Sequence, residues 1–229
     1  MITFRWFVRA CPPIVRDQPV WKPAKVTSAT PAFFELSRSL LLDRWGDYGS
    51  TLCNGMLRTE GGEERLDRAG PFVPPISFPP YSDGAAIVTS EARQKLEASG
   101  LSGVGEFRPV LLGKVVHIDW QKWDRRRRLD GKFLPYNGEP EEYILDNPHD
   151  AETAAAIGQL WTWHPSRIGT VLRENGVMRL EGIMGKHDVF RLCDAGWKDI
   201  IVSENGMRCV RDILGDWVTF KRIEYGIVS

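Results

Sequence analysis

The amino-acid sequence predicts an α+β fold with mixed or antiparallel sheets. The prediction rests on two stretches, residues 86–110 and 199–223, which show the same order of features when one is laid on the other without a gap. Each opens with a short apolar run, continues through a Ser-Glu pair into a helical segment, and closes with a second run that carries a phenylalanine. We therefore expect a repeated strand–helix–strand unit in which Phe107 and Phe220 occupy equivalent buried positions.

The helix of each unit is expected to begin at its serine. Ser90 and Ser203 follow the apolar runs, and a serine hydroxyl at this position accepts a hydrogen bond from a backbone N–H of the first turn. Glu91 and Glu204 then lie where the helix dipole favours negative charge. We interpret both serines as helix caps, because neither is bracketed by the glycines of a hydrolase nucleophile turn.

Residues 1–82 are expected to form an N-terminal region of strand, helix and hairpin. Apolar and polar residues alternate over residues 2–9, which predicts a strand with one buried face. Thr30-Pro31 is typical of a helix start, and apolar residues follow it at helical spacing, namely Phe33, Leu36 and Leu40. This pattern predicts a helix after Pro31.

The second half of this region predicts a hairpin followed by a connector. Two short strand-like runs flank Glu60-Gly61-Gly62-Glu63, a sequence that turns easily. The proline-rich stretch between Pro71 and Pro80 is expected to be extended and packed by its own apolar residues, because proline cannot donate to a sheet ladder.

Residues 83–229 are expected to form an α+β body that contains both units. The pattern predicts a strand through residues 110–118, a loop over 135–142, a helix that begins near Asn147 and reaches Trp161, and strands over 171–184. No Gly/Ser-rich linker separates this body from residues 1–82, so one continuous domain is the alternative to two.

Composition excludes several classes of protein. Lys plus Arg and Asp plus Glu number 30 each, so the net charge gives no reason to expect a nucleic-acid or membrane partner. The apolar runs are far shorter than the roughly 20 residues that span a bilayer. Arg5 and Arg9 interrupt the start of the chain, which does not fit a signal peptide. We therefore expect a cytoplasmic protein.

The four cysteines lack a metal-binding or redox spacing. No two of them stand in a CxxC arrangement, and a protein without a secretion signal keeps its thiols reduced. We expect buried, reduced cysteines and neither a metal nor another cofactor.

One pair of residues could support catalysis. His117 and Asp119 are two apart, which on a strand directs both side chains to the same face. Such a pair could bind a metal and assist hydrolysis, but no third ligand stands at a telling distance. A metal-assisted hydrolase is therefore the alternative function, and an ordinary surface pair is the simpler interpretation.

The most unusual stretch of the sequence combines tryptophan with arginine. It contains Trp120, Trp123 and the run Arg125, Arg126, Arg127 and Arg128. These residue types are favoured where proteins bind other proteins, and they could also stack on bases and contact phosphates. Asp119, Asp124 and Asp130 could equally balance the charge of a solvated loop. We expect a partner-binding segment here, with nucleic-acid binding as a third hypothesis.

The repeated unit also resembles a known family. The segments Val88-Thr89-Ser90-Glu91, Gly100-Leu101-Ser102-Gly103 and Phe107-Arg108-Pro109-Val110 are similar to a signature of bacterial immunity proteins of polymorphic toxin systems. The group includes proteins with a double CXXCG motif, whose cysteine pairs this chain lacks. The C-terminal ending of the same family is similar to two further segments, Asp188-Val189-Phe190-Arg191-Leu192 and Ile200-Ile201-Val202-Ser203-Glu204.

The resemblance implies a protein without enzymatic activity that binds and neutralises a cognate toxin. The missing CXXCG pairs mean that a zinc-binding role does not carry over to this chain. We expect a toxin or another protein as the partner, no membrane partner and no enzymatic activity, and the sequence carries no signal for a particular oligomeric state.

Overall fold

The computed structural model confirms an α+β fold with mixed sheets. It describes residues 32–39, 52–60, 63–79, 86–118, 140–174, 177–181, 187–193, 199–223 and 226–227. The predicted strand over residues 2–9 and the segment Trp120–Arg128 lie outside these ranges. None of the described helices is long and apolar enough to cross a bilayer.

The described strands form three sheets. The six-stranded sheet has the spatial order β2 (Met56–Glu60), β3 (Glu63–Gly70), β6 (Glu106–His117), β7 (Leu160–His164), β5 (Ala86–Thr89) and β4 (Ile76–Ser77). The four-stranded sheet has the order β10 (Val189–Phe190), β11 (Ile200–Ser203), β1 (Phe33–Arg38) and β12 (Val218–Arg222). The three-stranded sheet has the order β13 (Gly226–Ile227), β9 (Val177–Glu181) and β8 (Thr170–Glu174).

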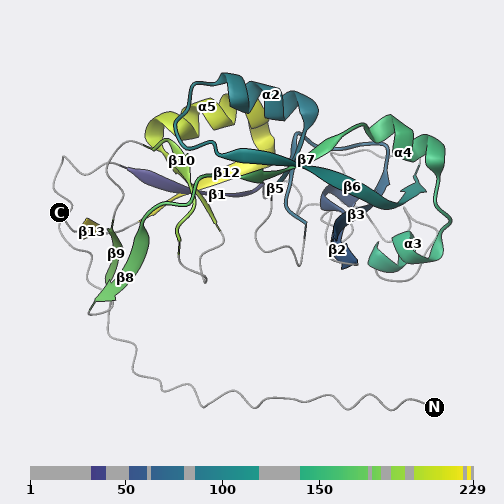
Figure 1. Ribbon diagram of the computed structural model, residues 1–229, viewed down its shortest axis with the longest axis horizontal. Coiled ribbons are helices and arrows are strands. Elements are labelled where there is room, and N and C mark those ends of the chain that lie inside the picture. The colour runs from purple at the N-terminus through teal and green to yellow at the C-terminus, as the bar shows by residue number, and fades with distance from the viewer. Residues whose placement is uncertain are drawn as a thin grey trace, which may run out of the picture.

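Two helices pack together on one side of the two larger sheets, and two shorter ones lie at one end of the molecule. Figure 1 shows α2 (Ser90–Ala98) beside α5 (Glu204–Leu214), both above the strands, while α3 (Pro140–Asp146) and α4 (Ala151–Ile157) lie near β3 and β6. A single 3-10 turn, η3 (Gly215–Trp217), joins α5 to β12.

The two larger sheets contain the same arrangement of four strands. Helix α2 connects β5 to β6, and the antiparallel strand β7 lies between them. Helix α5 connects β11 to β12, and the antiparallel strand β1 lies between those two. Each arrangement ends in a two-residue strand, β4 beside β5 and β10 beside β11. Both predicted stretches therefore have the order strand, helix, strand.

The strand registers also correspond. Trp163 of β7 lies opposite Ala86 and Phe107. Leu36 of β1 lies opposite Ile200 and Phe220 in the same way. The two phenylalanine rings are partly buried and pack against one common core cluster. That residues 86–110 and 199–223 are copies of one unit stays a prediction.

The common core cluster draws on both predicted regions of the chain. It includes Leu36 and Ile76 from the N-terminal part, Leu96 from α2, and Val210 and Leu214 from α5. The proposed division near residue 82 stays a prediction, and this cluster shows that both sides of it contribute to one interior.

One of the two predicted caps is wrong. Ser203 accepts a hydrogen bond from the backbone N–H of Gly206 and caps α5, as predicted. Helix α2 is capped instead by Thr89, which accepts from the N–H of Ala92, and Ser90 is the first helical residue. Threonine serves as a cap almost as well as serine, so sequence alone does not choose between two adjacent hydroxyl residues.

The predicted helix after Pro31 is wrong over the residues described, because Phe33–Arg38 form strand β1. The spacing of Phe33 and Leu36 fits either structure, since short apolar runs do not distinguish a helix from a buried strand. The space between β11 and β12 decides the outcome, because β1 pairs with both of these strands. Tertiary pairing here overrides the local pattern.

Other predicted elements are confirmed or shifted. The hairpin is confirmed, with Glu60 of β2 opposite Glu63 of β3. The strand through residues 110–118 is confirmed by β6, and the strands over 171–181 by β8 and β9. The proline-rich connector contains the short strand β4, where Ile76 and Ser77 carry no proline ring and pair with β5.

Two boundaries after residue 135 differ from the prediction. Residues 140–146 form helix α3 and not a loop, because Pro140 is tolerated in a first helical turn and two glutamates follow it. The next helix ends at Ile157, and Gly158 follows with a positive φ of 73°. Leu160 to His164 then form β7 between β5 and β6, so the predicted helix to Trp161 is wrong.

The described cysteines are free thiols with unequal exposure. Cys53 is buried, Cys209 is partly buried and Cys193 is exposed, so the expectation of a buried thiol is wrong for Cys193. Burial and the nearby carboxylates of Asp212 and Asp188 raise the pKa of Cys209 above its ordinary value.

Asp188 joins the loop after α2 to the start of α5. One carboxylate oxygen accepts hydrogen bonds from the backbone N–H and the hydroxyl of Ser102, at 3.1 and 2.9 Å. The other accepts from the Ser203 hydroxyl at 2.9 Å and from the Asn205 amide at 3.0 Å. Burial raises the pKa of Asp188, but the hydrogen bonds from Asn205, Ser102 and Ser203 outweigh it and hold the pKa below the ordinary 3.8.

This junction is expected to weaken in acid. A carboxyl whose pKa is lowered by folding stabilises the protein above its unfolded pKa, and this stabilisation is lost as the pH falls through the folded pKa. Denaturant unfolding of the wild-type protein should therefore show falling stability below the ordinary pKa of 3.8, and Asp188→Asn should reduce this pH dependence. Asp212→Asn, at an exposed position of α5, is the matched control. Identical pH profiles for wild type and Asp188→Asn would contradict the interpretation.

Candidate functional site

All of the residues predicted to bind a partner lie outside the described part of the chain. Trp120, Trp123 and Arg125–Arg128 all fall there, and so does Asp119 of the alternative catalytic pair. Their assignment therefore stays a prediction.

His117 lies at the exposed end of β6. Its Nδ1 atom is 3.1 Å from the hydroxyl of Thr153, and its carbonyl accepts a hydrogen bond from the Tyr143 hydroxyl. Within the described ranges, no three His, Cys, Asp or Glu residues are grouped so that they could hold a metal. The described residues around His117 therefore provide a hydroxyl partner and no set of metal ligands.

The nearby His149-Asp150 pair organises the start of α4. Asp150 accepts a hydrogen bond from the Thr153 N–H at 2.6 Å and caps the helix. That backbone bond and a side-chain bond from Thr153 lower the pKa of Asp150, although burial acts against them. His149 Nδ1 accepts from the Val115 N–H at 3.1 Å. Both side chains thus serve the local structure.

A different group of side chains has the character of a binding site. It lies where α2 meets β6 and β7, and it centres on Arg93. The guanidinium carbon of Arg93 is 3.7 Å from the ring centroid of Trp161 and 5.9 Å from that of Phe107. The Nε atom of Arg93 donates to Glu97, one helical turn further along, at 2.9 Å.

The sequence explains why these groups meet. Arg93 and Glu97 are four residues apart and therefore share one face of α2. Trp161 and Trp163 are two apart on β7, so both rings point to the same side of the sheet. Phe107 lies opposite Trp163 in the strand register, and the two rings stack with an interplanar angle of 9°.

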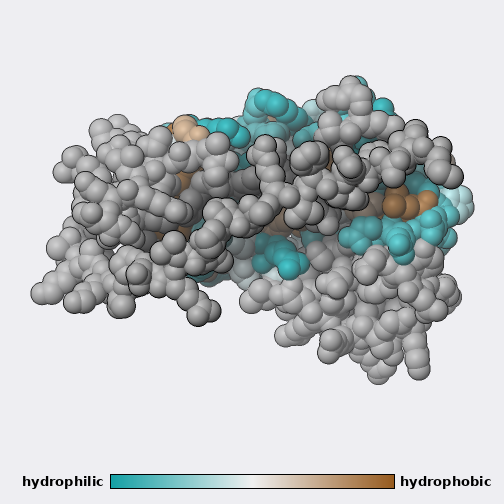
Figure 2. All heavy atoms as spheres, turned by 90° about the horizontal axis from the view of Figure 1, so that it is seen from below, coloured by the Kyte–Doolittle hydropathy of each residue, from teal (hydrophilic) through white to brown (hydrophobic). Residues whose placement is uncertain are grey.

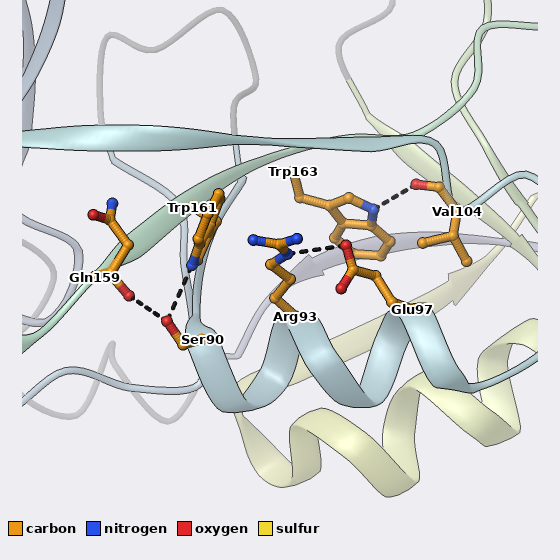
Figure 3. A network of polar contacts seen from close by, with 7 residues as sticks. All are labelled: Ser90, Arg93, Glu97, Val104, Gln159, Trp161 and Trp163. Carbon is orange, nitrogen blue, oxygen red and sulfur yellow. Dashed lines mark hydrogen bonds and ion pairs between the residues drawn. The ribbon is translucent and has the colours of Figure 1, made fainter.

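Hydrogen bonds fix both indole rings. The Trp161 indole N–H donates to the Ser90 hydroxyl at 3.0 Å, and that hydroxyl donates to the carbonyl of Gln159 at 2.9 Å. The Trp163 indole N–H donates to the carbonyl of Val104 at 2.8 Å. Figure 3 shows these side chains together with Arg93 and Glu97. Trp163 is fully buried, whereas the Arg93 side chain is 28% exposed.

Two further apolar residues continue this group along β6. Pro109 and Leu111 lie two and four residues beyond Phe107 on β6, so they point to the same side of the strand as Phe107. Pro109 is exposed, and 44% of Leu111 is exposed. The arginine–aromatic surface is defined here as Arg93, Phe107, Pro109, Leu111 and Trp161. Figure 2 shows another side of the molecule, seen from below, where hydrophobic areas among the described residues are small and bordered by hydrophilic ones.

Comparison of the chain with protein-family models, curated proteins and solved structures finds no match. The function is therefore argued from the geometry of the arginine–aromatic surface. This surface holds no nucleophile beside a base, and its chemistry is that of binding through aromatic rings and a guanidinium group.

The arginine–aromatic surface was not predicted from the sequence. The sequence Trp161-Thr162-Trp163 alternates large apolar and polar residues, which is a signal for a strand with both tryptophans on one face. Because the helix was predicted to reach Trp161, residues 161–163 were not interpreted as a strand. No local pattern could place Arg93 over Trp161, because the two residues lie far apart in the chain and meet only through the pairing of β5 with β7.

Proposed function

We propose that this chain is a non-enzymatic protein that binds another protein, and that it acts in the cytoplasm as an immunity-type inhibitor of a cognate bacterial toxin. The observation that carries the binding role is the arginine–aromatic surface, where Arg93 stacks on Trp161 beside exposed Pro109 and Leu111. Arginine and tryptophan dominate binding energy at protein interfaces, especially beside apolar groups that exclude water.

The choice of a toxin as partner rests on the resemblance of the strand–helix–strand stretches to immunity proteins. The first stretch supplies β5 and the start of β6 to the six-stranded sheet, and the second supplies β11 and β12 to the four-stranded sheet. Arg93, Phe107 and Pro109 of the arginine–aromatic surface belong to the first stretch. The segment Trp120–Arg128 stays a predicted partner-binding segment.

The test uses two exposed leucines that differ in position. The partner to be titrated by calorimetry is a toxin-like protein that is encoded next to this chain and co-purifies with it. Leu111→Arg should weaken binding by about tenfold or more, which corresponds to about 1.4 kcal/mol, because it places a charge in the apolar part of the surface. Leu145→Arg is the matched control, since Leu145 is 49% exposed and lies on α3.

Both variants should keep the thermal midpoint of the wild type, because both side chains are exposed. If the partner binds the two variants with equal affinity, the arginine–aromatic surface is not part of the interface. If no neighbouring protein co-purifies with the wild-type chain, the immunity role fails.

A further inference from the structure

The terminal nitrogens of Arg93 have a distinctive environment. The Nε atom is engaged by Glu97, and one face of the guanidinium group covers Trp161. Among the residues that the structure describes, none accepts a hydrogen bond from Nη1 or Nη2 of Arg93. These two atoms therefore form a charged, planar end with N–H donors that no described residue uses.

This end is held in place by interactions on two sides. Glu97 fixes the side-chain torsion through Nε, and Trp161 fixes the plane of the guanidinium group. Trp161 is itself held by the Ser90 hydroxyl, which is anchored on a backbone carbonyl. A ligand that binds here does not have to order a freely rotating arginine, so the usual entropy cost of immobilising such a side chain is reduced.

The geometry points to a carboxylate as the ligand. We propose that Arg93 receives a carboxylate from an acidic segment of the partner protein, bound in a bidentate manner by Nη1 and Nη2. Two parallel N–H···O bonds match the fork of a guanidinium group to the two oxygens of a carboxylate. This inference rests on the proposed function, since it names the chemical group through which the partner meets the arginine–aromatic surface.

The surroundings favour an acidic protein segment over a nucleic acid. Phe107 lies beside the arginine, and Pro109 and Leu111 continue along the same side of β6. These apolar groups suit the side chains that flank an acidic residue. Arg108 alternates with Phe107 and Pro109 on β6, so it points to the opposite side of the strand, where it is paired with Glu106. Nucleic-acid binding depends on several cations that contact successive phosphates, whereas this surface presents one arginine end.

The experiment detects the carboxylate site without the partner. The folded chain is titrated with the α-amide of N-acetyl-glutamic acid at neutral pH, while NMR follows the Arg93 guanidinium signals and the Trp161 indole N–H. The α-amide of N-acetyl-glutamine, which has the same shape and no charge, and dimethyl phosphate are titrated in parallel. We expect saturable shifts at both reporters with the glutamic acid compound, and an association constant about tenfold above that of the glutamine compound.

Matched variants separate binding from packing. Arg93→Lys keeps the charge and loses the fork, so it should abolish the saturable shift of the Trp161 indole. Arg211→Lys is the control, because Arg211 of α5 makes a comparable cation–π contact, 5.1 Å from the ring centroid of Phe220. This substitution should leave the titration unchanged. A lower thermal midpoint for Arg93→Lys, with no saturable shift in the wild type, would show a packing role only and overturn the proposal.

Two other outcomes would also overturn the proposal. An equal response to the glutamine compound would show that charge is not recognised, and tighter binding of dimethyl phosphate would assign the site to phosphate. The titration does not involve the toxin-like protein. Saturable carboxylate binding without any co-purified partner would therefore refute the proposed function and leave the Arg93 site standing.

Discussion

Replacement of Trp163 by alanine is expected to lower the free energy of unfolding by about 3–5 kcal/mol. Trp163 is among the largest fully buried side chains of the described chain. It stacks on Phe107, and its indole N–H donates to the carbonyl of Val104. Its loss leaves a cavity in the core cluster to which α2 and α5 contribute. It also removes the ring on which Phe107 of the arginine–aromatic surface stacks.

Urea unfolding of Trp163→Ala and Trp163→Phe measures this loss of stability and separates the contribution of the ring from that of the hydrogen bond. The phenylalanine variant keeps a ring and loses the hydrogen bond to Val104, so its cost should be about 1–3 kcal/mol and smaller than that of alanine. If the alanine variant is no less stable than the phenylalanine variant, the ring does not support the core as described.

The second large effect is expected at Gly103, where alanine meets both backbone strain and a steric clash. Gly103 has a φ of +81°, and an added Cβ would lie 2.1 Å from the carbonyl oxygen of Val189. The left-handed conformation costs a residue with a Cβ about 1–2 kcal/mol. Forcing β10 away from the loop adds about 1–3 kcal/mol more.

Gly100→Ala provides the matched control for this substitution. Gly100 has a φ of +71°, and an added Cβ would meet nothing within 4 Å. It should therefore show the conformational cost alone, and the difference between the two variants in denaturant unfolding gives the cost of the clash. Equal destabilisation of the two variants would mean that β10 can move away from the loop that follows α2 without a cost in free energy.

The elements that the sequence predicts correctly have local signals. The turn between Glu60 and Glu63 depends on adjacent glycines, and its hairpin forms as predicted. The cap at Ser203 depends on residues next to it in the chain, and it also forms as predicted. The α+β class follows from the alternation of apolar runs with a helical segment, which again is visible over short distances.

The features that the sequence does not predict depend on residues distant in the chain. Phe33 and Leu36 become part of a strand because β11 and β12 leave a space between them. Arg93 becomes part of a surface because the pairing of β5 with β7 brings Trp161 beneath α2. A local sequence pattern contains no information on contacts between residues that are distant in the chain. The fold class could therefore be predicted, and the arginine–aromatic surface could not.

The central position of β1 has a consequence for how the protein is made. Phe33 pairs with Ser203, so about 170 residues separate two neighbours in the four-stranded sheet, a large separation for a single contact. A ribosome that adds about 5–20 residues per second needs roughly 10–30 seconds to cover that distance. Throughout this interval Phe33 and Leu36, buried in the finished protein, have no sheet to enter. The four-stranded sheet can form around β1 only after β12 has been synthesised. The nascent chain therefore carries an unpaired apolar strand for most of its synthesis.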